Sequence, residues 1–173
     1  MSSALILTGT CGSGKTTISK LLAKGFGWIR IAEDDIWKSH IGKNRGPFRS
    51  EEHRLKRLRV HSEVFAAIVA AYRANQQVVI DATVHETPPD SYQEYKSFFE
   101  AHSIPWRICV LHPPLEVAIA RDSQRSGWIP GQERVVLLRG KFTAEVFGHE
   151  SFIDNSDETP EQTSIRIAQF DAA

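Results

Sequence analysis

Hydrophobic residues occur along this chain in two patterns, which alternate. Short apolar runs bounded by polar or glycine residues indicate buried strands, and apolar residues spaced three or four apart indicate amphipathic helices. The runs predict five strands, at residues 4–8, 28–32, 77–82, 106–111 and 152–154. The spaced segments predict helices at residues 14–25, 33–41, 50–75, 88–101, 114–125, about 132–147 and 159–170. Strands and helices that alternate in this way form a parallel sheet covered by helices on both faces.

Two of the predicted helices carry end signals. Ser50 can cap the helix at residues 50–75, and its first turn is acidic, which suits the positive end of the helix dipole. Thr159 and Gln162 have the spacing of a capping box at the last helix. The long helix shows one apolar stripe, which we expect to face the core, formed by Leu55, Leu58, Phe65, Ile68, Val69 and Tyr72.

Length and composition fit one compact α/β domain over residues 1–173. The chain is 41% hydrophobic, and its formal net charge is +0, so no overall field favours nucleic acid or membranes. Cys11 and Cys109 form no disulfide framework, which fits a reducing compartment. The amino-terminal residues lack a basic signal-peptide region, and the longest apolar stretch, residues 64–72, is too short to span a bilayer. These features predict a cytoplasmic protein.

The strongest motif is GxxxxGKT at residues 9–16, a Walker A loop placed between a predicted strand and a predicted helix. Its glycines let backbone N–H groups point at phosphate oxygens, and the helix amino terminus adds its positive dipole end. Lys15 places a charge on the β- and γ-phosphates, and the Thr16 hydroxyl is a ligand for Mg²⁺. The sequence therefore predicts ATP and Mg²⁺ as cofactors. The residues assigned to the nucleotide here are Gly9, Gly12, Ser13, Gly14, Lys15, Thr16 and Thr17.

Other nucleotide-binding classes lack their markers in this sequence. It contains no NKxD base reader of a GTPase and no LSGGQ signature of an ABC-type ATPase. It is also short for a helicase or an AAA+ module with its usual extra parts. Elimination favours a small kinase, with a nucleotide-binding protein or weak ATPase as the alternative.

Carboxylates follow two of the predicted strands, at the sheet edge where ligands bind. Asp34, with Asp35 second, is the candidate that accepts or orients the acceptor hydroxyl; the alternative is helix capping. Asp81 resembles a Walker B position that reaches Mg²⁺ or grips the substrate; the alternative is a turn-forming role. Thr83 lies just beyond, where it could touch the substrate.

Two arginines four residues apart, Arg121 and Arg125, precede a glycine- and proline-containing loop. They predict a lid at about residues 121–131 that closes over the triphosphate, because guanidinium groups suit phosphate oxygens. The alternative is a solvated basic helix end. Asn155 lies in the loop after the last strand, which is either an adenine-side loop or an ordinary polar turn.

Together these motifs resemble the adenylate-kinase-like small P-loop kinases, over nearly the whole chain. The pattern is most similar to the kinase module of polynucleotide 5′-hydroxyl kinases and the ATP-binding kinase-like proteins grouped with them. Gluconate kinase, shikimate kinase and chloramphenicol phosphotransferase look more distant. The resemblance implies a P-loop NTPase fold, Asp34 as general base and Arg125 on the transferred phosphate. The matching segments are residues 9–16, 31–36, 79–83, 121–125 and 153–156.

The acceptor is predicted from the segment at residues 34–75. Polynucleotide kinases carry DDxR after the second strand, whereas this chain has Trp37 at that position and Lys38 beside it. This departure argues against a nucleic acid 5′ end, which stays the alternative to a small-molecule acceptor. A local basic bias predicts an anionic acceptor, and the alternative is a solvated helix face. The basic residues, of which Lys38 and Arg49 are assigned to the substrate, are Lys38, Lys43, Arg45, Arg49, Arg54, Lys56, Arg57 and Arg59.

Overall fold

A five-stranded, all-parallel sheet forms the centre of the molecule, in the order β2-β3-β1-β4-β5. The computed structural model describes residues 2–41, 50–84, 91–126 and 129–170. All five predicted strands are present, and their carboxyl ends meet at one edge of the sheet. Their bounds are β1 (Ala4–Gly9), β2 (Ile29–Ala32), β3 (Val78–Asp81), β4 (Trp106–Leu111) and β5 (Phe152–Ile153).

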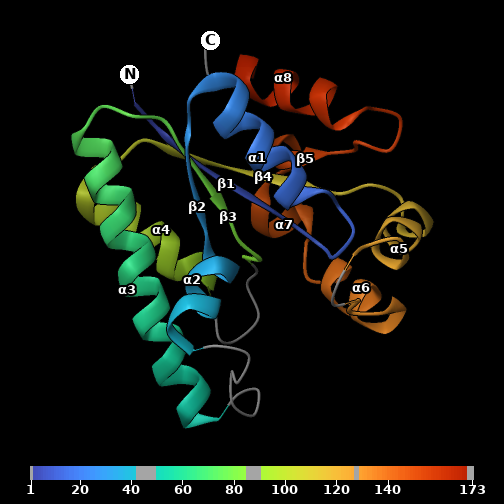
Figure 1. Cartoon of the computed structure of the whole chain (residues 1–173), viewed down its shortest axis with the longest axis horizontal. Helices are drawn as coiled ribbons and strands as arrows, with labels where there is room; N and C mark the ends of the chain where they lie inside the picture. Colours follow the sequence, from blue (N-terminus) through green and yellow to red (C-terminus); the bar gives the residue numbers. More distant parts are fainter. Residues whose placement is uncertain (1, 42–49, 85–90, 127–128, 171–173) are drawn as a thin grey trace.

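Helices cover both faces of this sheet, so the predicted α/β fold class is confirmed. α1 and α8 lie side by side over one face, and α3 and α4 cover the other (Figure 1). The helices are α1 (Lys15–Phe26), α2 (Glu33–Ile41), α3 (Glu51–Arg73), α4 (Ser91–His102), α5 (Leu115–Ser123), α6 (Gln132–Arg139), α7 (Ala144–Phe147) and α8 (Pro160–Phe170), with the short 3₁₀ helix η1 (His149–Ser151). None of the helices in the described ranges is both long and apolar enough to cross a bilayer.

The central strand β1 is buried on both faces, which explains its continuous apolar run. Ala4 and Ile6 pack with α3 and α4, whereas Leu5 and Leu7 pack with α1 and α8. Each fully buried aliphatic side chain of this size contributes about 1.5–3 kcal/mol to folding. The strand therefore fixes the position of the loop that follows Gly9.

The buried face of α3 differs from the predicted stripe. Ser50 caps the helix as predicted, because its Oγ accepts a hydrogen bond from the His53 N–H at 3.1 Å. Leu55 and Leu58, however, are exposed. The amino-terminal half of α3 extends beyond the sheet (Figure 1), so its inward contacts are with other helices and include polar groups. The residues buried along α3 are Arg57, Val60, His61, Val64, Ile68 and Ala71.

The single helix predicted at about residues 132–147 is wrong, since two helices occupy this stretch. α6 ends at Arg139, and Gly140 and Thr143 flank the break before α7. Interrupting the helix lets Phe142 and Phe147 both pack against Val110 of β4. The capping box of α8 is confirmed by reciprocal bonds: the Thr159 N–H donates to Gln162 Oε1 and the Gln162 N–H to Thr159 Oγ1.

Candidate active site

The glycine-rich loop joins β1 to α1 and has a backbone that requires glycine. Gly9, Gly12 and Gly14 have φ values of 141°, 76° and 98°, where side chains with a Cβ are strained. A Cβ on Gly9 would lie 2.4 Å from the Leu111 carbonyl oxygen, and one on Gly12 would lie 2.0 Å from that of Ala118. The loop is therefore pressed closely against β4 and α5.

Lys15 folds back over this loop. Its Nζ donates hydrogen bonds to the carbonyl oxygens of Gly9 at 2.8 Å and Thr10 at 2.9 Å. Burial lowers the pKa of Lys15, and the nearby carboxylates of Asp81 and Asp34 oppose that shift. The ammonium thus lies within electrostatic reach of both acids, at the opening of the loop.

Two further contacts hold the loop from outside. Thr10 Oγ1 donates to the Val135 carbonyl of α6 at 2.8 Å, and Asn155 Nδ2 donates to the Ser13 carbonyl at 3.1 Å. Ser13 Oγ is buried near Gly9 and has no hydrogen-bond partner among the described residues. This orphaned hydroxyl and the curled backbone fit a bound phosphate group. Thr16 and Thr17 are exposed on the first turn of α1.

The two predicted acids of α2 differ in their surroundings. Asp35 accepts hydrogen bonds from Arg30 at 3.0 Å and Lys38 at 3.3 Å. Partial burial works against these bonds, but they lower the pKa of Asp35 below its usual range. Asp34 instead interacts with the ammonium of Lys15. This difference favours Asp34 over Asp35 as the acid next to the phosphates.

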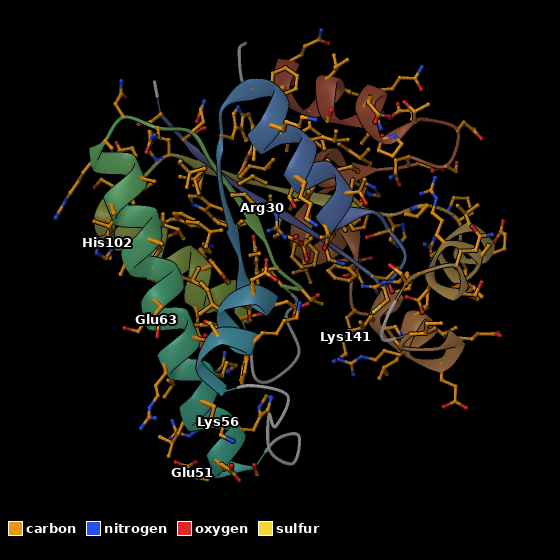
Figure 2. The ribbon with its side chains drawn as sticks, viewed as in Figure 1. Arg30, Glu51, Lys56, Glu63, His102 and Lys141 are labelled. Carbon is orange, nitrogen blue, oxygen red and sulfur yellow. The ribbon has the colours of Figure 1, made fainter. Side chains whose placement is uncertain are left out.

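Arg30 of β2 is a central residue that the sequence prediction missed. Its Nη2 donates to Asp81 Oδ2 at 2.7 Å, its Nε to Ser19 Oγ at 2.8 Å and its Nη1 to Asp35 at 3.0 Å. Figure 2 shows Arg30 near the middle of the molecule, beside α1. It connects β2, β3, α1 and α2. A charged residue inside an otherwise apolar strand run was the available signal, because buried charges need partners.

The surroundings of Asp81 narrow its predicted roles. Arg30 Nη2 and Ser19 Oγ both donate to Asp81 Oδ2, at 2.7 and 3.0 Å. Ser19 Oγ also lies 3.2 Å from the backbone carbonyl oxygen of Thr16, the threonine assigned to Mg²⁺. One oxygen of Asp81 is thus bonded to Arg30 and Ser19, and its part in a Mg²⁺ site stays a prediction.

The predicted lid arginines have separate partners. Arg121 Nη2 donates to the carbonyl oxygens of Asn155 at 3.0 Å and Ser156 at 3.3 Å, so it braces the β5–α8 loop. Arg125 is bonded to Asp122 at 3.2 Å and acts electrostatically on Lys15. Asp122, which the sequence prediction did not single out, is buried and also accepts from the Gly131 N–H at 3.3 Å. It ties together the two ends of the predicted lid loop.

The other residues assigned to the acceptor differ in their exposure and surroundings. Thr83 and Lys38 are exposed, and Arg49 lies outside the described residues. Trp37, at the position of the arginine in DDxR, is buried and its ring stacks on His53 with centroids 5.5 Å apart. It therefore offers no charge to a phosphate.

Several basic side chains of α3 are paired with acids, which favours the solvated-face alternative for them. Arg54 pairs with Glu51 at 2.6 Å, and Lys56 with Glu52 at 2.6 Å. Glu51 and Lys56 lie on the end of α3 that is far from Arg30 (Figure 2).

Solved structures with this architecture include small kinases. A sugar kinase from Janibacter sp. HTCC2649 superposes with a TM-score of 0.70 at 20% identity, covering 99% of this chain and 95% of that one. Shikimate kinase from Acinetobacter baumannii, solved with shikimate, gives 0.66 at 16% identity over 99% and 94%. A chain of the Pnkp1/Rnl/Hen1 RNA repair complex gives 0.63 at 22% identity, over 81% of this chain and 43% of that one. These likenesses show the fold, that of small P-loop kinases.

Searches by sequence alone find a family but no close relative. No curated protein matches the chain significantly. A family model described as an AAA domain, AAA_33, matches residues 5–136. The match supports the predicted small P-loop kinase fold. The specific grouping with polynucleotide kinases stays a prediction. With its P-loop, five-stranded parallel sheet and this match, the chain belongs to the AAA_33 family of AAA domains.

Proposed function

We propose that this protein is an ATP-dependent kinase that transfers the γ-phosphate to a hydroxyl group of a small acceptor. The observation that carries the proposal is the P-loop itself, with Lys15 Nζ bonded to the Gly9 and Thr10 carbonyl oxygens and the charges of Asp81, Asp34 and Arg125 acting on that ammonium. A base, a phosphate-binding cation and a second cation at one loop are the groups that phosphoryl transfer to an alcohol requires.

Each residue has a role in this reaction. The acceptor oxygen attacks the γ-phosphorus, a new O–P bond forms, and the bond to the β-phosphate bridging oxygen breaks, leaving ADP. Asp34 accepts the hydroxyl proton. Lys15 and the loop N–H groups hold the phosphate oxygens, and Arg125 balances their charge in the transition state. Mg²⁺, held through Thr16 with Asp81 nearby, would neutralise the β- and γ-phosphates.

The proposed acceptor is a small molecule with a free hydroxyl, bound by the segment at residues 34–75. Sugar and shikimate kinases share this fold. Four of the described basic residues are paired with acids, namely Lys38, Arg54, Lys56 and Arg57. The predicted anionic character of the acceptor therefore depends on the exposed Arg59 and on basic residues outside the described ranges. A 5′-hydroxyl nucleic acid remains the second candidate, since an RNA repair complex contains a similar fold.

The test is an ADP-release screen with Mg²⁺ and ATP over sugars, sugar acids, nucleosides, aminoglycosides and a 5′-hydroxyl oligonucleotide. We expect acceptor-dependent release with one class. Asp34→Asn should bind ATP normally but lose about 10²–10⁴-fold in turnover, the usual contribution of a general base. Asp35→Asn is the matched control, because its carboxylate is next in sequence but paired with Arg30 and Lys38.

Two results would overturn this proposal. Slow hydrolysis that no acceptor accelerates would favour the weak-ATPase alternative. Equal losses in the Asp34 and Asp35 variants would show that the base is not Asp34.

A further inference from the structure

A second group of charged side chains lies between α2, α3 and α4, away from the P-loop. His61 of α3 is the most buried of them, with only 3% of its side chain exposed. Its Nδ1 is 2.6 Å from Glu94 Oε2 of α4, and its Nε2 is 3.6 Å from Glu33 Oε1 of α2. Arg57 donates hydrogen bonds from both terminal nitrogens to the same Glu94 carboxylate, at 2.6 and 2.7 Å. The cluster therefore joins three helices.

The charges of this cluster balance only when His61 is protonated. Glu33 and Glu94 bring two negative charges, and Arg57 brings one positive charge. Burial of the imidazole acts to lower its pKa, but the two carboxylates raise the pKa of His61 to about 9. A neutral imidazole would leave an uncompensated carboxylate in a site that is largely shielded from water, which is costly.

The cluster is connected to the candidate base by one peptide bond. Glu33 begins α2 and directly precedes Asp34. Successive side chains of a helix point about 100° apart. Glu33 is directed at α3, so the Asp34 side chain has a different direction, and its charge raises the pKa of Lys15. A second contact fixes the same helix, because Trp37 donates from Nε1 to Glu33 Oε1 at 3.3 Å and stacks on His53.

We infer that His61 is a positioning residue, whose positive charge holds Glu33 and so sets the orientation of Asp34 toward the transferred phosphate. The inference rests on the proposed function of Asp34 as the base. It predicts that the site loses its geometry when His61 loses its proton, although His61 itself does not touch the nucleotide loop.

Among the described groups that face His61, the imidazole itself is the one that we expect to change its charge at alkaline pH. α2 contributes Glu33, and α4 contributes Glu94 and the buried Tyr95, whose ring centroid is 5.6 Å away. α3 contributes Arg57, through Glu94, and Phe65. Burial raises the pKa of Tyr95 well above its usual value, so its hydroxyl stays neutral. Because the folded-state pKa of His61 exceeds the ordinary value of 6.5, its stabilising effect is complete below about pH 6.5 and is lost as pH rises through about 9.

The first experiment follows the His61 ring in the whole protein by ¹H–¹³C NMR between pH 5.5 and 10. We expect a midpoint near 9 in the wild type and a lower midpoint in Glu33→Gln. This readout needs no acceptor and no catalysis. A wild-type midpoint near 6.5 would overturn the inference, whatever the activity of the enzyme.

The second experiment compares kinetics of variants with the acceptor found in the screen. His61→Gln should lower kcat about 10–100-fold with little change in KM for ATP, as expected when a catalytic group is misplaced. His61→Lys keeps the charge and should recover part of the loss. The wild type should lose kcat as pH rises through about 9, and His61→Gln should lack that fall. His102→Gln, at the last residue of α4, is the control and should behave as wild type.

The outcomes separate this inference from the proposed function. Wild-type kcat and an unchanged alkaline limb in His61→Gln, with Asp34→Asn inactive, would refute only the positioning role. Full activity in Asp34→Asn would refute the base itself. If His61→Gln does not fold, Glu33→Gln replaces it, because Glu33 is more exposed than His61 and the Glu94–Arg57 pair stays intact. If Glu33→Gln then had the kcat and the alkaline pH dependence of the wild type, the inference would be refuted.

Discussion

Arg30 offers the sharpest stability test of the site, because it connects residues from four elements. Arg30→Met removes the guanidinium but keeps an apolar stem of similar reach. Asp81, whose side chain is only 8% exposed, would then keep its hydrogen bond to the Ser19 hydroxyl and the electrostatic influence of the Lys15 ammonium. The variant thus leaves a shielded carboxylate with much less compensation.

The expected cost can be worked out from burial. Removing one partner of a buried ion pair costs about 3–5 kcal/mol. The Arg30 side chain is 17% exposed and Lys15 supplies some compensation, so we expect a somewhat smaller cost, about 2–4 kcal/mol. The bond to Asp35 adds little, because that side chain is 57% exposed and exposed pairs contribute about 0–1 kcal/mol.

The assay is a double-mutant cycle by urea unfolding with Arg30→Met, Asp81→Asn and the double variant. The Arg30–Asp81 coupling should exceed about 1.5 kcal/mol, within the range for residues in one network. Arg54→Met is the matched control, since its pair with Glu51 is exposed to solvent and should contribute little to stability. If Arg30→Met cost no more than Arg54→Met, or if the coupling were near zero, the central role given to Arg30 would be refuted.

Two further predictions concern glycine and helix capping. Gly12→Ala should abolish ATP binding measured by calorimetry, because the new Cβ would lie 2.0 Å from the Ala118 carbonyl oxygen. Gly25→Ala is the control and should bind ATP normally, because the space around Gly25 is open. Equal ATP binding by both variants would contradict the steric reasoning. Ser50→Ala should lose about 1 kcal/mol by removing the N-cap of α3. Thermal unfolding would show this as a fall of about 2–4 °C, and an unchanged midpoint would count against the cap.

The sequence was most informative where function depends on local order. The P-loop could be predicted because its glycines, its lysine and the start of the following helix all lie within the eight consecutive residues 9–16. The sheet could be predicted because strands buried on both faces have continuous apolar runs. Asp34 could be proposed as the base because the acidic run at residues 33–35 follows a strand, and that role stays a prediction.

The remaining features depend on contacts between distant segments. Arg30, Ser19 and Asp81 meet only after three elements pack, so their spacing along the chain carries no signal. Leu55 and Leu58 fitted an apolar stripe, but α3 extends beyond the sheet at that end, where Arg57 and His61 point inward instead. Helical periodicity gives the face of a helix and not the neighbour that it meets.

The most direct test of the proposed reaction is ³¹P NMR of Mg²⁺, ATP, enzyme and the acceptor from the screen. The reaction proposed for Lys15, Asp34 and Arg125 predicts ADP and a new phosphate monoester signal in equal amounts, both missing with Asp34→Asn. ADP accompanied only by inorganic phosphate, at the same rate with and without acceptor, would contradict the assignment of this site to phosphoryl transfer.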